Sequence, residues 1–144
     1  MRHALKPALL VVAVLAGVTV ALAQDISPGQ VIRPSGVPSA PLPTTEALRR
    51  GEALFSDKRL STNDMSCITC HADLQSFNDS FRRPYPHKVQ MAQDMAGLDE
   101  VSAETMVQFC MLVPMAARPF AWSSPDLTAL TAYVTKLQGD FARK

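Results

Sequence analysis

Two cysteines, Cys67 and Cys70, are followed directly by His71, and this group is the part of the sequence best suited to chemistry. Thiols three positions apart near the start of a helix can add to the two vinyl groups on one edge of a porphyrin, and the next residue can carry its imidazole to the iron. Without the histidine, such a pair could equally form a redox disulfide or part of a zinc site. A zinc site needs four ligands, and only Cys110 and His87 remain as soft ligands for one. We therefore predict one covalent haem c, bound through Cys67 and Cys70 and ligated by His71.

The sixth iron ligand is chosen from His, Met, Cys or Tyr side chains, or the position stays open. Met115 is the first choice, because it lies in a loop that the neighbouring Pro114 holds away from helical geometry. Cys110 is the alternative sixth ligand. It is the odd cysteine of three, and such a cysteine in an exported protein is a free thiol, an intermolecular bridge or a ligand. Cys110 can also be interpreted as a small buried hydrophobic residue. As sixth ligands, His87 and Met111 rank behind Met115 and Cys110.

Other side chains are candidates to contact the rest of a haem. Arg82, Arg83 and Arg118 can pair with the propionates, because buried carboxylates need partners, or they can simply be solvated. His87 lies just after the first two arginines, and we expect it to be solvated or to contact a propionate. Trp122 either closes over the haem edge or belongs to the core.

The first residues are typical of a secretory signal peptide. Basic residues precede an apolar run from Ala8 to Leu22, and small residues end it at Ala23, which predicts cleavage of residues 1–23 and export to the bacterial periplasm. The alternative is an uncleaved membrane anchor, although the run is short for a span of about 20 residues. Covalent haem attachment occurs after export, so the signal and the cysteine motif support each other. No second apolar stretch is long enough to cross a bilayer, so we expect no stable membrane insertion after cleavage.

The rest of the chain divides by composition. Cleavage removes Arg2 and Lys6 and leaves 12 basic and 13 acidic residues, a balance that excludes a strongly basic nucleic-acid binder. Residues 24–44 contain five prolines and no apolar periodicity, so we predict a flexible tail. Residues 45–144 then form one compact domain.

The sequence predicts an all-α domain, and its long connections need a haem to pack against. Gly51 in the first helix costs about 1 kcal/mol relative to alanine, which predicts close approach by another element. Ser102 is a candidate cap for the middle helix, and Gly139 is expected to end the last one. Residues 73–97 show little periodicity and are expected to wrap a ligand. The predicted helices cover residues 46–55, 98–111 and 125–138.

The order of these features resembles class I c-type cytochromes. Gly51 and Phe55 stand on the first helix, the haem motif follows, a methionine lies in a late loop, and Tyr133 lies on the last helix. The resemblance implies a cytochrome c fold, in which the first and last helices cross and Gly51 allows close approach near Tyr133. It also implies that His71 and Met115 are the axial pair.

A narrower likeness is to haem domains of the SoxA and thiosulfate dehydrogenase type. It is carried by residues 51–55, which lead into the haem motif, and by residues 110–133. In that group a cysteine at the position of Cys110 can ligate the iron. This chain departs from the group in Pro114 and Met115 and in having only one haem motif.

Two functions follow from these observations. The first is a periplasmic monohaem cytochrome that carries single electrons between protein donors and acceptors and is not itself an enzyme. The alternative is the haem subunit of a complex that oxidises a sulfur compound such as thiosulfate, in which Cys110 takes part in the chemistry. A haem peroxidase ranks behind both, because no distal acid–base pair is recognisable in the sequence.

Overall fold

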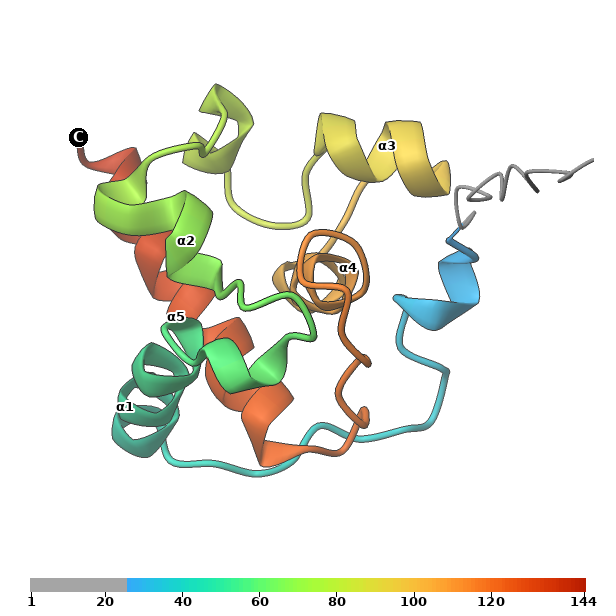
Figure 1. Cartoon of the computed structure of the whole chain (residues 1–144), viewed down its shortest axis with the longest axis horizontal. Coiled ribbons are helices and arrows are strands. Elements are labelled where there is room, and N and C mark those ends of the chain that lie inside the picture. The colour runs from blue at the N-terminus through green and yellow to red at the C-terminus, as the bar shows by residue number, and fades with distance from the viewer. Residues whose placement is uncertain (1–25) are drawn as a thin grey trace, which may run out of the picture.

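The computed structural model describes residues 26–144, and the predicted signal peptide, residues 1–23, lies outside this range. The described chain is helical, and its only β-type pairing is an isolated bridge between His87 and Val101. The all-α class predicted from the sequence is therefore confirmed, as Figure 1 shows. No helix of this part of the chain combines the length and apolar character that crossing a bilayer requires. The α-helices are α1 (Thr44–Phe55), α2 (Cys67–His71), α3 (Gln90–Ala96), α4 (Ala103–Leu112) and α5 (Pro125–Ala142), joined by loops and short 3-10 turns.

The crossing of α1 and α5 is the most extensive helix–helix contact in the described residues. Gly51 makes it possible, because a Cβ atom there would overlap the Ala129 carbonyl oxygen and lie 2.6 Å from the Cβ of Tyr133. The helix propensity lost at a glycine, about 1 kcal/mol, is thus offset by packing that any larger residue would prevent. This confirms the close approach expected at Gly51.

The caps of α4 and α5 follow the sequence signals. The Ser102 hydroxyl accepts a hydrogen bond from the Thr105 N–H at 3.0 Å, and the Ser124 hydroxyl accepts one from the Asp126 N–H at 3.1 Å. The predicted start of the middle helix at residue 98 was wrong, because the capped helix begins only at Ala103.

The predicted end of the last helix at Gly139 was also wrong. The helix continues to Ala142, and ion pairs bridge its last turns. Lys136 contacts Asp140 at 2.6 Å, four residues on, and Asp140 also pairs with Arg143.

Helix α3 lies in the stretch that was expected to lack regular structure. Ala92 and Ala96 form its buried side, and Gly97 ends it with a φ of 64°, in the left-handed region that favours glycine. Seven residues are too few for a clear helical period, so the pattern was missed.

The segment before α1 differs from the flexible tail predicted for residues 24–44. Val31 is fully buried in a core cluster, and Arg33 reaches Glu104 on α4 through its Nε at 2.9 Å and also through Nη2. The Arg33 Nη1 donates to the carbonyls of Val37 and Pro38, so the proline-rich chain is fixed along the domain (Figure 1). The burial of Val31, the ion pair of Arg33 with Glu104 and a hydrogen bond from the Thr128 hydroxyl to the Ala40 carbonyl at 3.3 Å order this segment, and none of them produces a periodic pattern. The cluster around Val31 contains Ala92, Ala96, Leu98, Val101 and Phe109.

Replacing Val31 by alanine should therefore lower the free energy of unfolding of the haem-loaded protein by about 1.5–3 kcal/mol. Ile32 provides a matched control, because it is the next residue and is 46% exposed. Ile32→Ala should change stability by no more than about 0.5 kcal/mol. Urea denaturation followed by far-ultraviolet circular dichroism measures both values. Equal, small effects of the two substitutions would show that the segment does not hold its place in solution.

Candidate haem site

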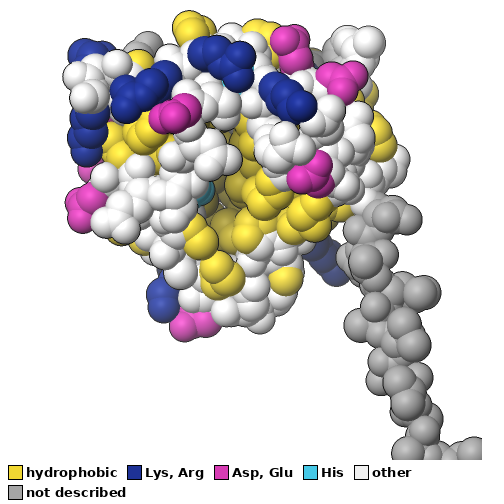
Figure 2. Space-filling view, turned by 90° about the horizontal axis from the view of Figure 1, so that it is seen from above, with side chains coloured by type: hydrophobic (Ala, Val, Ile, Leu, Met, Phe, Trp, Pro, Cys, Tyr) yellow, Lys and Arg dark blue, Asp and Glu magenta, His cyan; other side chains and the backbone are white. Residues whose placement is uncertain are grey.

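A cavity of about 320 Å³ lies among α2, α3, α4 and α5. Its walls are mainly apolar, and Figure 2 shows it as a hollow ringed by hydrophobic side chains. Cys67, Cys70 and His71 line this cavity together. The structure thus places the predicted attachment motif at the edge of a cavity that is open to the surface.

Helix α2 positions the motif. The Ser66 N–H donates to the hydroxyl of Thr69 at 2.9 Å, which fixes the first turn. Cys67 and Cys70 are three positions apart and therefore lie on one face of this helix. Both are free thiols rather than a disulfide, as thioether formation requires.

His71 is oriented by a hydrogen bond to the main chain. Its Nδ1 lies 3.1 Å from the Gln75 carbonyl oxygen, and donation from Nδ1 leaves Nε2 free to bind a metal. Burial lowers the pKa of His71, while the contact with Gln75 acts in the opposite direction to a smaller extent. The imidazole stacks on Phe77 at 4.0 Å between ring centres. The neutral, fixed ring has the form that an axial iron ligand needs.

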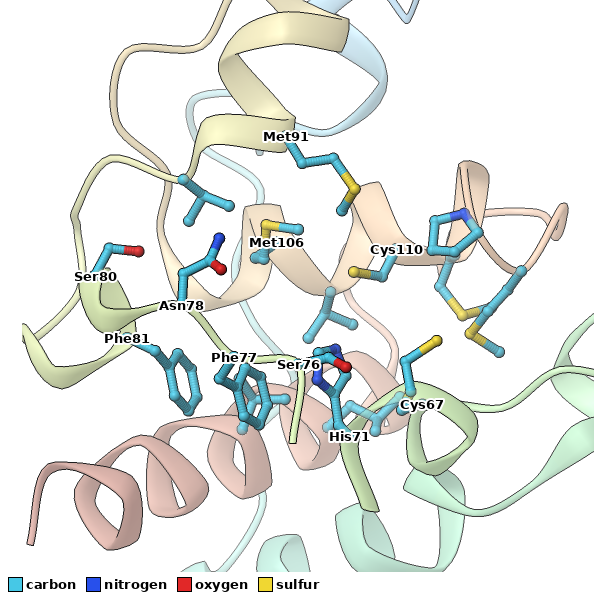
Figure 3. Close-up of a pocket in the computed structure, with 18 of the residues that line it drawn as sticks. Cys67, His71, Ser76, Phe77, Asn78, Ser80, Phe81, Met91, Met106 and Cys110 are labelled. Atoms are coloured by element: carbon cyan, nitrogen blue, oxygen red, sulfur yellow. The ribbon is translucent and has the colours of Figure 1, made fainter. Parts of the chain in front are cut away.

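All four candidates for the sixth ligand line the same cavity: Met115, Cys110, His87 and Met111. Cys110 projects into it from α4, on the side opposite His71, as Figure 3 shows. Burial, with smaller effects of the Cys67 and Cys70 thiols, raises the pKa of Cys110 to about 12. A thiol in this position remains protonated unless a cation such as iron pairs with it.

Met115 is held by its own loop. It is 2% exposed and forms a small cluster with Met111 and Ala117, against which Cys67 also packs. The Met115 N–H donates to the Cys110 carbonyl at 3.2 Å, which fixes the loop close to the end of α4. Met115 therefore belongs to the wall beside the attachment cysteines, and its role as the sixth ligand stays a prediction.

The arginines proposed as propionate partners do not line the cavity. Arg82 instead lies over the ring of Phe141 at 5.0 Å and 3.8 Å from the Asp79 carboxylate. Arg83 and Arg118 are also absent from its walls within the described residues. Trp122 lies under the Arg33 guanidinium and packs on a core cluster, which supports its interpretation as a core residue.

Sequence reasoning missed several residues of the cavity wall, among them Met91, Tyr85 and Phe77. Met91 is 39% exposed and points into the cavity from α3, a helix that was itself missed (Figure 3). Met91 and Met95 are four positions apart and Gly97 follows them, and this pattern was the sequence signal that could have predicted α3. Burial raises the pKa of Tyr85, and Cys110, which lines the same cavity, contributes in the same direction.

The side chains of this cavity fit haem c. Two free thiols stand on one face of α2, an oriented imidazole follows them, and a third thiol faces that imidazole across apolar walls. The cavity also contains a buried histidine, His87, whose ring nitrogens have no partner among the described residues. Such a group needs a polar ligand.

The fold and this site define a c-type cytochrome domain with one covalently bound haem c. The profile of the SoxA/TsdA cytochrome c domain matches residues 50–140, so the chain belongs to this family. Searches among curated proteins and among solved structures found no significant match. The likeness noted in the sequence, to SoxA and thiosulfate dehydrogenase haem domains, is thereby confirmed.

Proposed function

We propose that this chain is an exported, periplasmic cytochrome that transfers single electrons through one haem, held by Cys67, Cys70 and His71. When bound, haem c supplies an iron that accepts and gives up one electron. The observation that carries the proposal is the cavity that these three residues line and that opens at the surface (Figure 2). An edge of the haem near the surface would allow electron exchange with redox protein partners.

We propose Cys110 as the sixth ligand, ahead of Met115. Two observations support this order. The Cys110 side chain faces His71 across the cavity (Figure 3), and it is a member of none of the apolar clusters found in residues 26–144. Met115, by contrast, is packed in a cluster with Met111 and Ala117. A methionine so placed can serve as wall without contacting the iron.

The second candidate function is that of a haem subunit in an enzyme that oxidises a sulfur compound. It is favoured by the family match and by the Cys110 thiol inside the cavity. The two functions differ in whether thiosulfate itself reduces the bound haem. They agree on the haem attachment and on single-electron exchange with a partner protein.

Anaerobic mixing of the ferric, haem-loaded protein with two reductants separates these functions. Hexaammineruthenium(II), a simple outer-sphere donor of one electron, should reduce the haem rapidly and in a single phase. Thiosulfate alone should leave the absorption spectrum unchanged if the protein is a carrier. Reduction by thiosulfate that is lost in Cys110→Ser, while reduction by the ruthenium complex persists, would favour the enzyme subunit.

A further inference from the structure

His87 is a buried polar side chain whose ring makes no hydrogen bond of ordinary geometry to the described part of the chain. It is 4% exposed and lines the cavity, and neither Nδ1 nor Nε2 has such a partner, although the main chain of Pro84 and Arg83 lies near enough to act on its pKa against the larger, lowering effect of burial. Buried polar atoms are nearly always paired, because an unpaired one loses its hydration without compensation. In the haem-loaded protein, the haem should therefore supply a hydrogen-bond partner to the His87 ring.

The main chain and a neighbouring ring hold His87 in place. The main-chain N–H of His87 donates to the Val101 carbonyl at 3.2 Å, and the main-chain N–H of Val101 donates to the His87 carbonyl at 3.0 Å. The imidazole stacks on Tyr85, with the ring centres 4.3 Å apart and the planes inclined by 23°. The ring is thus a fixed feature of the wall and not a surface side chain that has folded inward.

The main chain of His87 pairs with the chain just before α4, and this position indicates which part of a haem the side chain meets. Val101, its bridge partner, precedes the first turn of α4, whereas Cys110 lies about 10 Å further along this helix than its first residue, Ala103. In Figure 3 the order from Met106 to Cys110 runs toward the end of the cavity that holds Cys67. His87 therefore lies toward the opposite end.

The attachment chemistry fixes what reaches that opposite end. Cys67 and Cys70 take the vinyl groups on one side of the porphyrin, and the two propionates leave from the other side. Figure 3 shows Asn78 and Ser80 at the end away from Cys67. Asn78 is exposed and Ser80 half-buried, so water can serve both of them, which leaves His87 as the buried polar group there.

We propose that His87 donates a hydrogen bond to a haem propionate and so positions the haem in its cavity. The inference rests on the proposed haem site and goes beyond it, because it chooses the propionate contact over the solvated position that the sequence had left open for His87, and it replaces the arginines as propionate partners. The pairing removes two costs at once. The carboxylate gains a donor inside an apolar cavity, and the imidazole gains an acceptor with better geometry than the nearby main chain offers.

Two variants of the haem-loaded protein test this assignment. His87→Leu fills the space without a donor, and His87→Asn keeps an N–H donor. His87→Leu should shift the propionate bending band in the resonance Raman spectrum, and His87→Asn should stay close to the wild type. With the carboxylate charge less compensated, His87→Leu should also favour ferric haem by about tenfold, a fall of about 59 mV in midpoint potential.

Lys88→Ala is the matched control, because Lys88 is the next residue, is exposed and does not line the cavity. It should leave the propionate band in place. A measurement on the unmodified protein does not depend on how the variants fold. In the ferrous state, a slowly exchanging His87 ring N–H should show a nuclear Overhauser effect to a propionate methylene.

The inference is overturned if His87→Leu leaves the propionate band unchanged, or if the ring N–H shows no effect to the propionate. It is also overturned if His87→Leu removes an axial ligand, because His87 would then bind the iron. Haem staining of the denatured protein distinguishes a failure of the role of His87 from a failure of the proposed haem site. Staining that persists in every variant shows that attachment stands even where the role of His87 fails.

Discussion

Replacing Cys67 and Cys70 together by alanine is expected to abolish haem staining of the protein on denaturing gels. Only covalently bound haem survives denaturation, and these two thiols stand on one face of α2 at the edge of the cavity. The double variant should therefore lose the stain completely, and its yield should fall. The apolar cavity would then have lost the group that fills it, and large unfilled cavities are costly.

Cys110→Ala is the control for this experiment. It removes the third thiol of the same cavity, which stands outside the attachment motif. It should therefore keep the stain at the size of the wild type. Haem that is freely extracted from the unmodified protein into acidified organic solvent would contradict covalent attachment.

The features that the sequence predicted well are those in which adjacent residues carry the whole signal. The haem motif occupies five consecutive positions, and the caps at Ser102 and Ser124 act on residues two or three positions away. Gly51 is similar, because a glycine inside a strong helical pattern indicates that another element packs closely against it. Each of these can be interpreted without knowing where the rest of the chain lies.

The features that were missed depend on contacts between distant residues. Val31 is buried against side chains about 60 to 80 positions away, and no local pattern in a proline-rich segment announces such a contact. His87 follows two arginines and two prolines, a composition typical of a surface loop. It is buried because its main chain pairs with Val101, a contact that depends on how the connection folds back.

The choice between Cys110 and Met115 shows the same limit in the functional site. The two residues are five positions apart, and both line the cavity. The loop position that made Met115 attractive says nothing about which side chain faces His71. That information comes from the direction of α4, which presents Cys110 to the cavity (Figure 3).

Cys110→Ser is expected to change the ferric spectrum and raise the midpoint potential, whereas Met115→Leu should change neither. A thiolate stabilises ferric iron and lowers the potential, and its loss should raise the potential by about 0.1 V or more, within the roughly 0.8 V range that axial ligands cover. Met115→Leu keeps the packing against Met111 and Ala117 and removes only the thioether sulfur.

Electron paramagnetic resonance of the ferric protein and potentiometric titration measure both effects. The outcome also fixes the range of potential in which this haem exchanges electrons, because a thiolate ligand gives a low potential and a thioether ligand a high one. If Met115→Leu instead removes the weak far-red band of thioether ligation and accelerates cyanide binding, Met115 is the sixth ligand. The Cys110 thiol would then be part of the wall, and the sulfur-oxidising function would lose the residue that favours it.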